Sequence, residues 1–421
     1  MLNIKTNLFL TYSIVLIIPL LITGSFIPDL VLSICVITYA YYLIKNDHFN
    51  FLKNYFYLFF LIFIISILIS SIISTNIKSI ISSIGYFRFL IFVSFISFMI
   101  QNSKKDLLLL IFYSIFFTYI FLLLEFSSQI VFKQTLFGNR VLNYDRFIIS
   151  SFYHEEIYSS FIVRTLPFFI GIFFLKKEKL SQFFKISFFI ISLLLVLTVI
   201  INGERAALGL LFLIFLFLII FLDFNLKFKI GIILSSLISI FIILGTISDT
   251  NFTRKVNGIK DFTNTIKNNL TANDSKRIIF SEKYDSLYKT SFNIYKEFPI
   301  LGIGIKNFRH FCSDKKFAHN QRSCATHPHN IIAQILAETG TVGFMFYLFS
   351  VLAIIRVIFT NLKNNKINKE KKNYIICLIC SLLISLWPLF PSGNIFNNWL
   401  SIIAFYPLGF LIHEINKSQK I

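Results

Sequence analysis

Two histidines flanking a proline form the part of this sequence best suited to acid–base chemistry. His327 and His329 stand on either side of Pro328, and Asn330 follows directly. An imidazole titrates near neutral pH, so it can accept a proton under physiological conditions. The fixed φ of proline stiffens the backbone between the two side chains. The histidines lie where a polar stretch ends and an apolar run begins, which predicts a site at a membrane surface.

Three arginines occupy positions where a charge is costly. Arg88 and Arg164 each lie inside a long apolar run, roughly 10–12 Å below its outer end at 1.5 Å per helical residue. Arg205 stands where one apolar run turns into the next. Arginine in a membrane span is usually functional, and a guanidinium stays charged at any pH while holding phosphate oxygens through two parallel hydrogen bonds. These residues predict a cationic pocket that suits a diphosphate.

Two further observations bear on this pocket. Arg277 heads a predicted helix in a basic loop, where its charge opposes the helix dipole, and a residue placed against its local preference is a hint of function. The competing interpretation is private ion pairing of Arg205 with Glu204, and of Arg164 with the glutamates at 155–156.

The composition places these residues in a membrane protein. The chain has 421 residues, of which 56% are hydrophobic and only 14% are charged. No soluble fold of this size can bury so much apolar surface, so the chain is predicted to cross a membrane many times. The net charge of +20 comes largely from lysine clusters in every second loop, which is the positive-inside pattern and does not indicate a nucleic-acid partner.

Apolar runs long enough to cross about 30 Å of hydrocarbon predict an all-α fold with about twelve membrane spans. An even count places both termini on one side, and the lysine clusters place that side in the cytoplasm. The hydrophilic stretch 248–328 follows the ninth span and therefore faces outward. No second soluble domain is visible, so residues 1–421 are expected to form a single membrane domain that includes this loop. The predicted spans are 8–25, 28–44, 55–74, 80–100, 106–126, 157–175, 185–201, 206–222, 229–247, 331–360, 374–390 and 398–413.

The long outer loop is predicted to be partly helical. Its apolar residues recur at three- and four-residue steps until Pro299, which is typical of an amphipathic helix. Such a helix can lie on the outer leaflet or pack on its own protein. Cys312 and Cys324 follow, and they can form a disulfide if the loop faces an oxidising compartment. The apolar residues of the pattern are Phe280, Tyr284, Leu287, Tyr288, Ile294, Tyr295 and Phe298.

Several short motifs together resemble the O-antigen ligase and polymerase superfamily. Their order, spacing and common outward placement make the combination specific, although each motif is short. The matching positions are the stretch 299–304, the histidine segment 327–330, Gln334, Glu338, Gly340, Gly343, the arginine motif 202–207, and the segment 155–167 with Ser159, Ser160, Arg164 and Pro167.

The resemblance implies a GT-C-like glycosyltransferase of the bacterial inner membrane with its active site facing the periplasm. Such enzymes transfer a glycan from an undecaprenyl-diphosphate carrier to a hydroxyl group, of lipid A-core in ligases and of another carrier-linked repeat in polymerases. By position, Arg205 and Arg277 match the two arginines that handle the diphosphate, and His329 matches the essential histidine. Asn330 and Glu338 are expected to support them. The implied partners are the carrier-linked donor, the glycan acceptor and membrane lipids.

The chemistry of these residue types agrees with the resemblance. A diphosphate is a good leaving group, so the reaction needs fixed positive charge where phosphate charge develops more than it needs a general acid. It also needs a base for the acceptor hydroxyl, which suits imidazole. No Asp-x-Asp metal site stands out in an outer loop, so we expect neither a metal nor another cofactor. Open alternatives are His327 as the base with His329 as a hydrogen-bond donor, Arg309 or Arg322 in place of Arg277, and Glu338 as a partner of a histidine or of Arg205.

The leading hypothesis is an O-antigen ligase-like glycosyltransferase. An O-antigen polymerase or a protein O-oligosaccharyltransferase of the same superfamily is the alternative. A transporter or flippase of lipid-linked glycans is a different class, and it would carry polar residues at mid-membrane and inverted-repeat symmetry. Here the charged residues cluster toward one leaflet and no such symmetry is visible.

Overall fold

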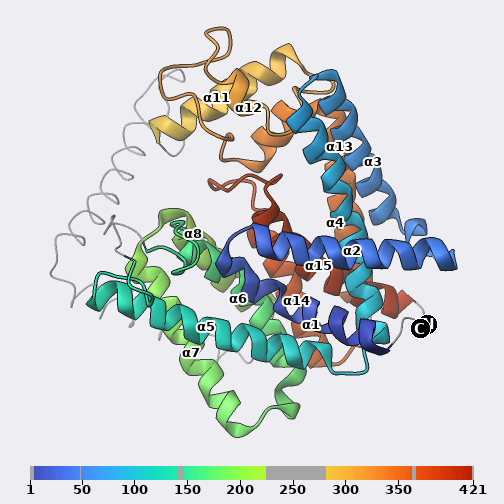
Figure 1. Cartoon of the computed structure of the whole chain (residues 1–421), viewed down its shortest axis with the longest axis vertical. Helices are drawn as coiled ribbons and strands as arrows, with labels where there is room; N and C mark the ends of the chain where they lie inside the picture. The colour runs from blue at the N-terminus through green and yellow to red at the C-terminus, as the bar shows by residue number, and fades with distance from the viewer. Residues whose placement is uncertain (1–3, 48, 140–146, 224–280, 363–366, 420–421) are drawn as a thin grey trace.

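The computed structural model describes residues 4–47, 49–139, 147–223, 281–362 and 367–419. Within these ranges every regular element is helical, in agreement with the predicted all-α class (Figure 1). The α-helices are α1 (Ile4–Leu20), α2 (Phe26–Asn46), α3 (Tyr55–Ile73), α4 (Ile77–Asn102), α5 (Leu107–Val131), α6 (Tyr158–Lys176), α7 (Gln182–Asn202), α8 (Arg205–Phe221), α11 (Glu282–Glu297), α12 (Phe308–Phe311), α13 (Ile331–Leu362), α14 (Lys369–Ser385) and α15 (Asn398–Gln419).

Eight of the described helices, α2 to α7, α13 and α15, are long and apolar enough to cross a membrane. The chain is therefore a multi-pass membrane protein. Leu8–Thr23 and α8 are shorter apolar helices, and α14 begins with charged residues. The predicted ninth span, 229–247, lies outside the described residues, so the count of twelve stays a prediction.

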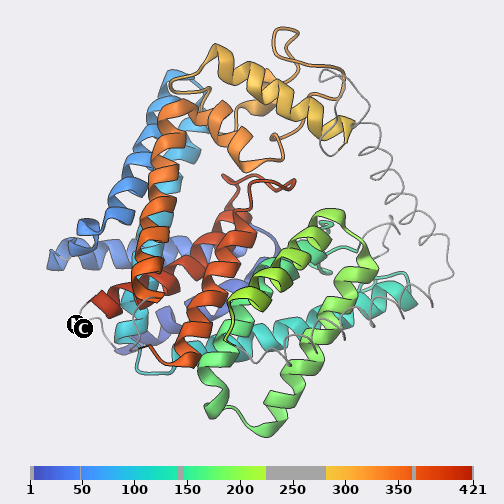
Figure 2. The ribbon, with the colours of Figure 1, turned by 180° about the vertical axis from the view of Figure 1, so that it is seen from behind.

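The helices gather into two groups that meet along the core. α14 packs along α6 and α15 along α4, while α3 lies beside both α4 and α13. Figures 1 and 2 show α3, α4 and α13 running toward the end of the molecule that carries α11 and α12. Residues 386–397, here called the α14–α15 connection, are non-helical and lie in the opening between the two groups in both views.

α11 is the amphipathic helix that the sequence predicts in the outer loop. Ser281 caps its start by accepting a hydrogen bond from the backbone N–H of Tyr284, and Pro299 follows soon after its end. Its apolar face packs against α13, so this helix packs on its own protein. The small core that results fixes the loop leading to the histidines; it contains Leu287, Ile294, Ile303, Phe308, Cys312, Phe317 and Ala337.

α13 is interrupted at Gly340, whose backbone has φ 65° and ψ −168°. The connection from α11 to α12 crosses this break and supplies partners to its backbone groups. On one side the Ile303 N–H donates to the Ala337 carbonyl at 3.1 Å. On the other the Thr341 N–H donates to the Pro299 carbonyl at 2.8 Å. The break is therefore hydrogen-bonded, which is the condition for non-helical backbone at membrane depth.

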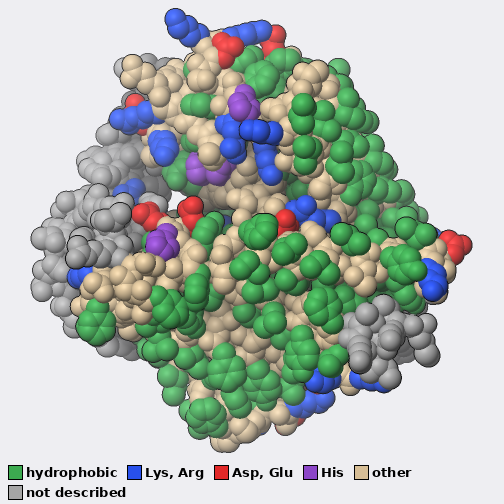
Figure 3. All heavy atoms as spheres, in the orientation of Figure 1, with side chains coloured by type: hydrophobic (Ala, Val, Ile, Leu, Met, Phe, Trp, Pro, Cys, Tyr) green, Lys and Arg blue, Asp and Glu red, His purple; other side chains and the backbone are tan. Residues whose placement is uncertain are grey.

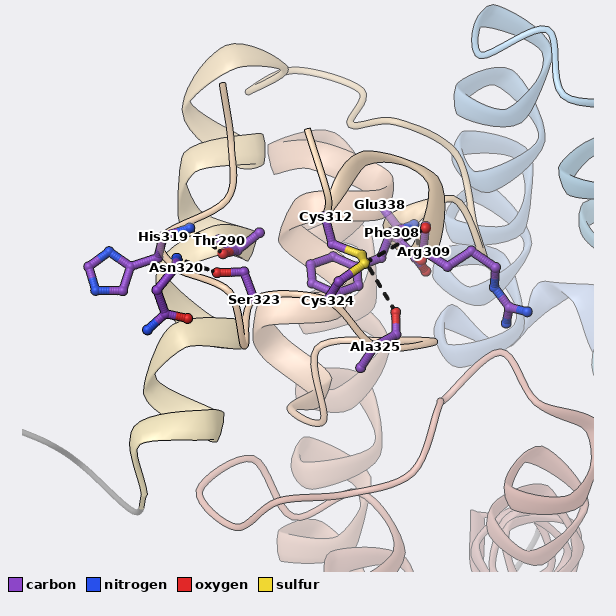
Figure 4. Close-up of a disulfide and its surroundings, with 10 residues drawn as sticks. All are labelled: Thr290, Phe308, Arg309, Cys312, His319, Asn320, Ser323, Cys324, Ala325 and Glu338. Carbon is purple, nitrogen blue, oxygen red and sulfur yellow. Dashed lines mark hydrogen bonds between the residues drawn. A yellow bond between two sulfur atoms is a disulfide. The ribbon is translucent and has the colours of Figure 1, made fainter. Parts of the chain in front are cut away.

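Cys312 and Cys324 form a disulfide within the loop that joins α12 to α13 (Figure 4). The bond joins cysteines 12 residues apart, so we expect its reduction to lower the free energy of unfolding by about 2–3 kcal/mol. Peptide mass analysis without reductant should show the two cysteines linked. Reduction should lower the melting temperature of the wild type and leave that of the Cys312→Ser/Cys324→Ser variant unchanged. Two free thiols would refute the bond.

Candidate active site

The two histidines lie together at the start of α13. Their ring centroids are 4.0 Å apart, with 45° between the ring planes. Asn330 caps the helix, since its Oδ1 accepts from the Ala333 N–H at 3.0 Å, and its Nδ2 donates to the Pro388 carbonyl at 2.6 Å. The histidine segment is thus fixed between α13 and the α14–α15 connection.

Both ring nitrogens of His327 are engaged. Nε2 donates to the Ser392 carbonyl at 3.2 Å, and Nδ1 accepts from the Thr326 hydroxyl at 2.9 Å. Burial, the neighbouring His329 and Arg309 lower the pKa of His327 to about 3, against the effect of the Ser392 hydrogen bond. The ring is therefore neutral with its proton on Nε2, and it positions the α14–α15 connection.

The ring of His329 has a different environment. Within the part of the chain that the structure describes, no hydrogen bond of ordinary geometry holds its ring, which stands edge-on to Tyr284 of α11 with centroids 5.7 Å apart. Its backbone is left-handed, with φ 58°, and the Ser392 N–H donates to its carbonyl at 2.9 Å. A left-handed histidine is uncommon, and such strain concentrates at functional sites. His329 is half-buried and is the histidine whose ring nitrogens can meet a substrate.

Burial and the positive charge of Lys283 lower the pKa of His329, and the nearby backbone of Ser392 opposes them. A base must be neutral to accept a proton, so we expect the acid limb of the pH–rate profile to lie below about pH 6.5. Lys283→Gln removes the positive neighbour and should move that limb to higher pH. Lys296→Gln, on the same helix, is the matched control and should leave it in place. Equal shifts in both variants would exclude His329 as the titrating group.

The α14–α15 connection links the histidines to both helix groups. Phe390 lies against α8 so closely that a Cβ added to Gly209 would be 3.1 Å from its ring. Ser392 holds the two histidines, as described above. Two residues later, Asn394 Oδ1 accepts from Gln334 Nε2 of α13 at 2.7 Å. One short segment therefore touches α8, the histidine pair and α13 in turn.

Glu338 is fully buried and anchors the loop rather than the histidines. Its carboxylate accepts from Gln334 Nε2 at 3.0 Å and from the Phe308 N–H at 3.2 Å, so it joins α12 to α13. Figure 4 shows it beside Phe308. Within the described residues, neither a histidine nor Arg205 is among its hydrogen-bond partners.

The arginine motif forms the turn from α7 to α8. Asn202 ends α7 and donates to Ser159 Oγ of α6 at 2.6 Å. Glu204, just before α8, interacts electrostatically with Arg164, which like Ser159 belongs to α6. Arg205 begins α8, is exposed, and has no hydrogen bond or ion pair with any residue in the described ranges. The structure therefore joins the two motifs, and it leaves Arg205 available to a ligand.

The other candidate arginines differ from Arg205. Nη1 of the buried Arg164 donates to both the carbonyl and the hydroxyl of Ser160. Arg88 forms an ion pair with Asp29 of α2, with 2.7 Å between nitrogen and oxygen. Both side chains thus have partners within the protein. Arg277 lies outside the described residues.

A cavity of about 360 Å³ lies between the start of α4, α12 and the α14–α15 connection. No acid is among its lining residues, and its basic side chains are those of Lys78, Lys306, Arg309 and His310. Figure 3 shows Lys, Arg and His side chains gathered where this face is hollowed, below α12. In Figure 4 Arg309 extends away from the disulfide toward the helices drawn in blue. The cavity is therefore a basic site beside the histidine segment.

Among the residues that line this cavity, the sequence predicts only Arg309 as a possible ligand of the diphosphate, in place of Arg277. Sequence reasoning missed Lys78, Lys306 and Asn394. A local signal marked Asn394, because prolines and a glycine interrupt the apolar runs within 388–393. The two lysines had no such signal, because only the tertiary fold brings them together.

Comparison with known proteins finds one family model that matches part of the chain. Residues 190–348 match the family model described as O-antigen ligase. The matched region includes the turn that carries Arg205, then α11, the histidine segment and the break in α13. A search of the curated proteins finds no match. This match supports the resemblance to the O-antigen ligase and polymerase superfamily that the motifs indicate.

Proposed function

We propose that this protein is a glycosyltransferase that moves a glycan from an undecaprenyl-diphosphate carrier to a hydroxyl group of lipid A-core. The family match supports the reaction class. The disulfide supports placement of the site on the periplasmic face of the inner membrane, because disulfides persist in oxidising compartments. The acceptor oxygen bonds to the anomeric carbon, and the carrier diphosphate leaves with the electrons of the broken bond.

The observation that carries the proposal is a difference between the two rings: both nitrogens of His327 are hydrogen-bonded, whereas no hydrogen bond of ordinary geometry holds the ring of His329 among the described residues. His329 takes the proton of the acceptor hydroxyl as the new bond forms. His327 stays neutral and positions the segment through Ser392. Their different hydrogen bonding thus separates a base from a positioning residue.

Arg205 is proposed to hold the leaving diphosphate. It stands at the N-terminus of α8, where backbone N–H groups also favour an anion. In this scheme Arg277 adds a second guanidinium, and fixed positive charge stabilises the phosphate oxygens without a metal or another cofactor.

Arg205→Lys tests the diphosphate role. Lysine keeps the charge but cannot form two parallel hydrogen bonds, so we expect kcat/KM to fall about 10- to 100-fold. Arg356→Lys, near the far end of α13, is the control and should behave as wild type. The measurement is glycan transfer in vitro by the purified proteins. Full activity of Arg205→Lys would remove the diphosphate role.

A surface-polysaccharide gel from a deletion strain tests the reaction itself. Loss of all glycan-capped lipid A-core, with carrier-linked polymer accumulating, supports the ligase. Cores bearing a single repeat would indicate a polymerase instead. An unchanged gel, with glycoproteins also unchanged, would favour transport over transfer.

A further inference from the structure

The loop that carries Lys306 into the cavity wall is hydrogen-bonded to the start of α4. Ser79 Oγ donates to the Ile305 carbonyl at 2.8 Å, and Asn76 Nδ2 donates to Asn307 Oδ1 at 2.7 Å. These bonds flank Lys306, whose backbone is left-handed with φ 61°. The side chain of Lys306 therefore starts from a fixed backbone at the cavity wall.

The positive charge of the cavity is not neutralised by direct contacts. In the described residues, no hydrogen bond or ion pair ties the side chain of Lys78, Lys306 or Arg309 to an acid. Burial, then Arg88 and Arg309, lower the pKa of Lys306, and the negative charges of Glu338 and Asp29 oppose them. Asp29 itself is already paired with Arg88. Such a concentration of cations suits a group that carries more than one negative charge, as phosphate does.

The α14–α15 connection meets α8 before it reaches the histidines, and it meets the cavity after them. Along the α14–α15 connection, Phe390 contacts α8, Ser392 holds the histidines, and Asn394 lines the cavity. In a displacement at the anomeric carbon, the attacking hydroxyl and the leaving diphosphate lie on opposite faces of the sugar, and the base lies beside the attacking hydroxyl. With the diphosphate at the start of α8, the acceptor falls on the side of the cavity.

We propose that this cavity is a phosphate subsite for the acceptor, which holds a phosphate group on the sugars of an acidic acceptor glycolipid and so brings the acceptor hydroxyl to His329. The inference rests on the proposed function and deepens it. Its volume falls within the range of about 300–1,000 Å³ that ligand sites occupy.

The test is a binding measurement on the full-length protein in phosphatidylcholine nanodiscs. The probe is rough lipopolysaccharide, which is lipid A-core without attached glycan, before and after chemical removal of its phosphate groups. We expect dephosphorylation to weaken binding to the wild type about 10- to 100-fold, because charge-assisted hydrogen bonds are lost. The Lys306→Gln/Arg309→Gln variant should bind the phosphorylated probe more weakly than the wild type by a similar factor. Its affinity for the dephosphorylated probe should change little. Lys315→Gln/Lys316→Gln, in the same loop and with the same change of charge, should bind as wild type.

Equal binding of the two probes to the wild type would overturn the inference, whether or not the double variant folds. Displacement of the phosphate-dependent binding by phosphatidylglycerol in the nanodiscs would assign the cavity to lipid headgroups and overturn it as well. In a transfer assay the Lys306→Gln/Arg309→Gln variant should raise the KM for the acceptor; a raised KM for the donor would contradict the assignment. Phosphate-dependent binding by a wild type that transfers no glycan would instead overturn the proposed function.

Discussion

The His329→Asn variant is expected to transfer glycan about 100- to 10,000-fold more slowly than the wild type, because that is the usual contribution of a general base. Asparagine is chosen because, like glycine, it tolerates the left-handed backbone that His329 adopts at φ 58°. The variant should therefore fold as wild type while lacking a base. His329→Ala should lose the same activity and, in addition, be destabilised by about 1 kcal/mol or more because alanine is strained at this φ.

His327→Gln is the matched comparison. Glutamine keeps an N–H that can reach the Ser392 carbonyl but removes the imidazole, so we expect a partial loss of activity and a small loss of stability. The measurement is transfer rate, with the melting temperature of each variant as the check on folding. Near-normal transfer by His329→Asn together with a large loss in His327→Gln would reverse the two roles.

Gly340→Ala is expected to be the most damaging single-methyl change to the fold near the site. Its Cβ would lie 2.3 Å from the Ile300 carbonyl oxygen, and its φ and ψ fall in a region that is essentially open to glycine alone. Because both the strain and the clash fall on backbone, neither can be relieved by a rotamer change. We expect a destabilisation of more than about 3 kcal/mol and a sharp loss of folded protein.

The control is Gly393→Ala, whose Cβ would meet only Leu400, at an ordinary 3.6 Å. Its melting temperature should stay close to that of the wild type. Gly302 packs on the other face of the break, where an added Cβ would lie 2.6 Å from the Glu338 carbonyl carbon. The Gly302→Ala variant should therefore resemble Gly340→Ala. A stable Gly340→Ala protein would mean that the break in α13 is not required for folding.

Patterns carried by neighbouring residues predicted the fold well. The period of apolar side chains predicted α11, and Pro299 predicted its end. The length of apolar runs predicted the eight described helices that are long and apolar enough to cross a membrane, while the count of twelve spans stays a prediction. The glycines at 302 and 340 had no structural explanation from local spacing, because each faces backbone more than thirty residues away in the chain.

The sequence by itself determined the all-α membrane class and the resemblance to the O-antigen ligase family, because apolar period and motif order are local properties. Only the tertiary structure decided which histidine is engaged and which is open, since the partner of His327 Nε2, Ser392, stands 65 residues away. The same holds for Arg88, which is paired with Asp29 across two helices, while Arg205 is left exposed. It holds also for the basic cavity, whose lysines come from α4 and from the loop before α12. Hydrogen bonding, ion pairing and cavity lining depend on which segments meet in space, and spacing along the chain does not encode that.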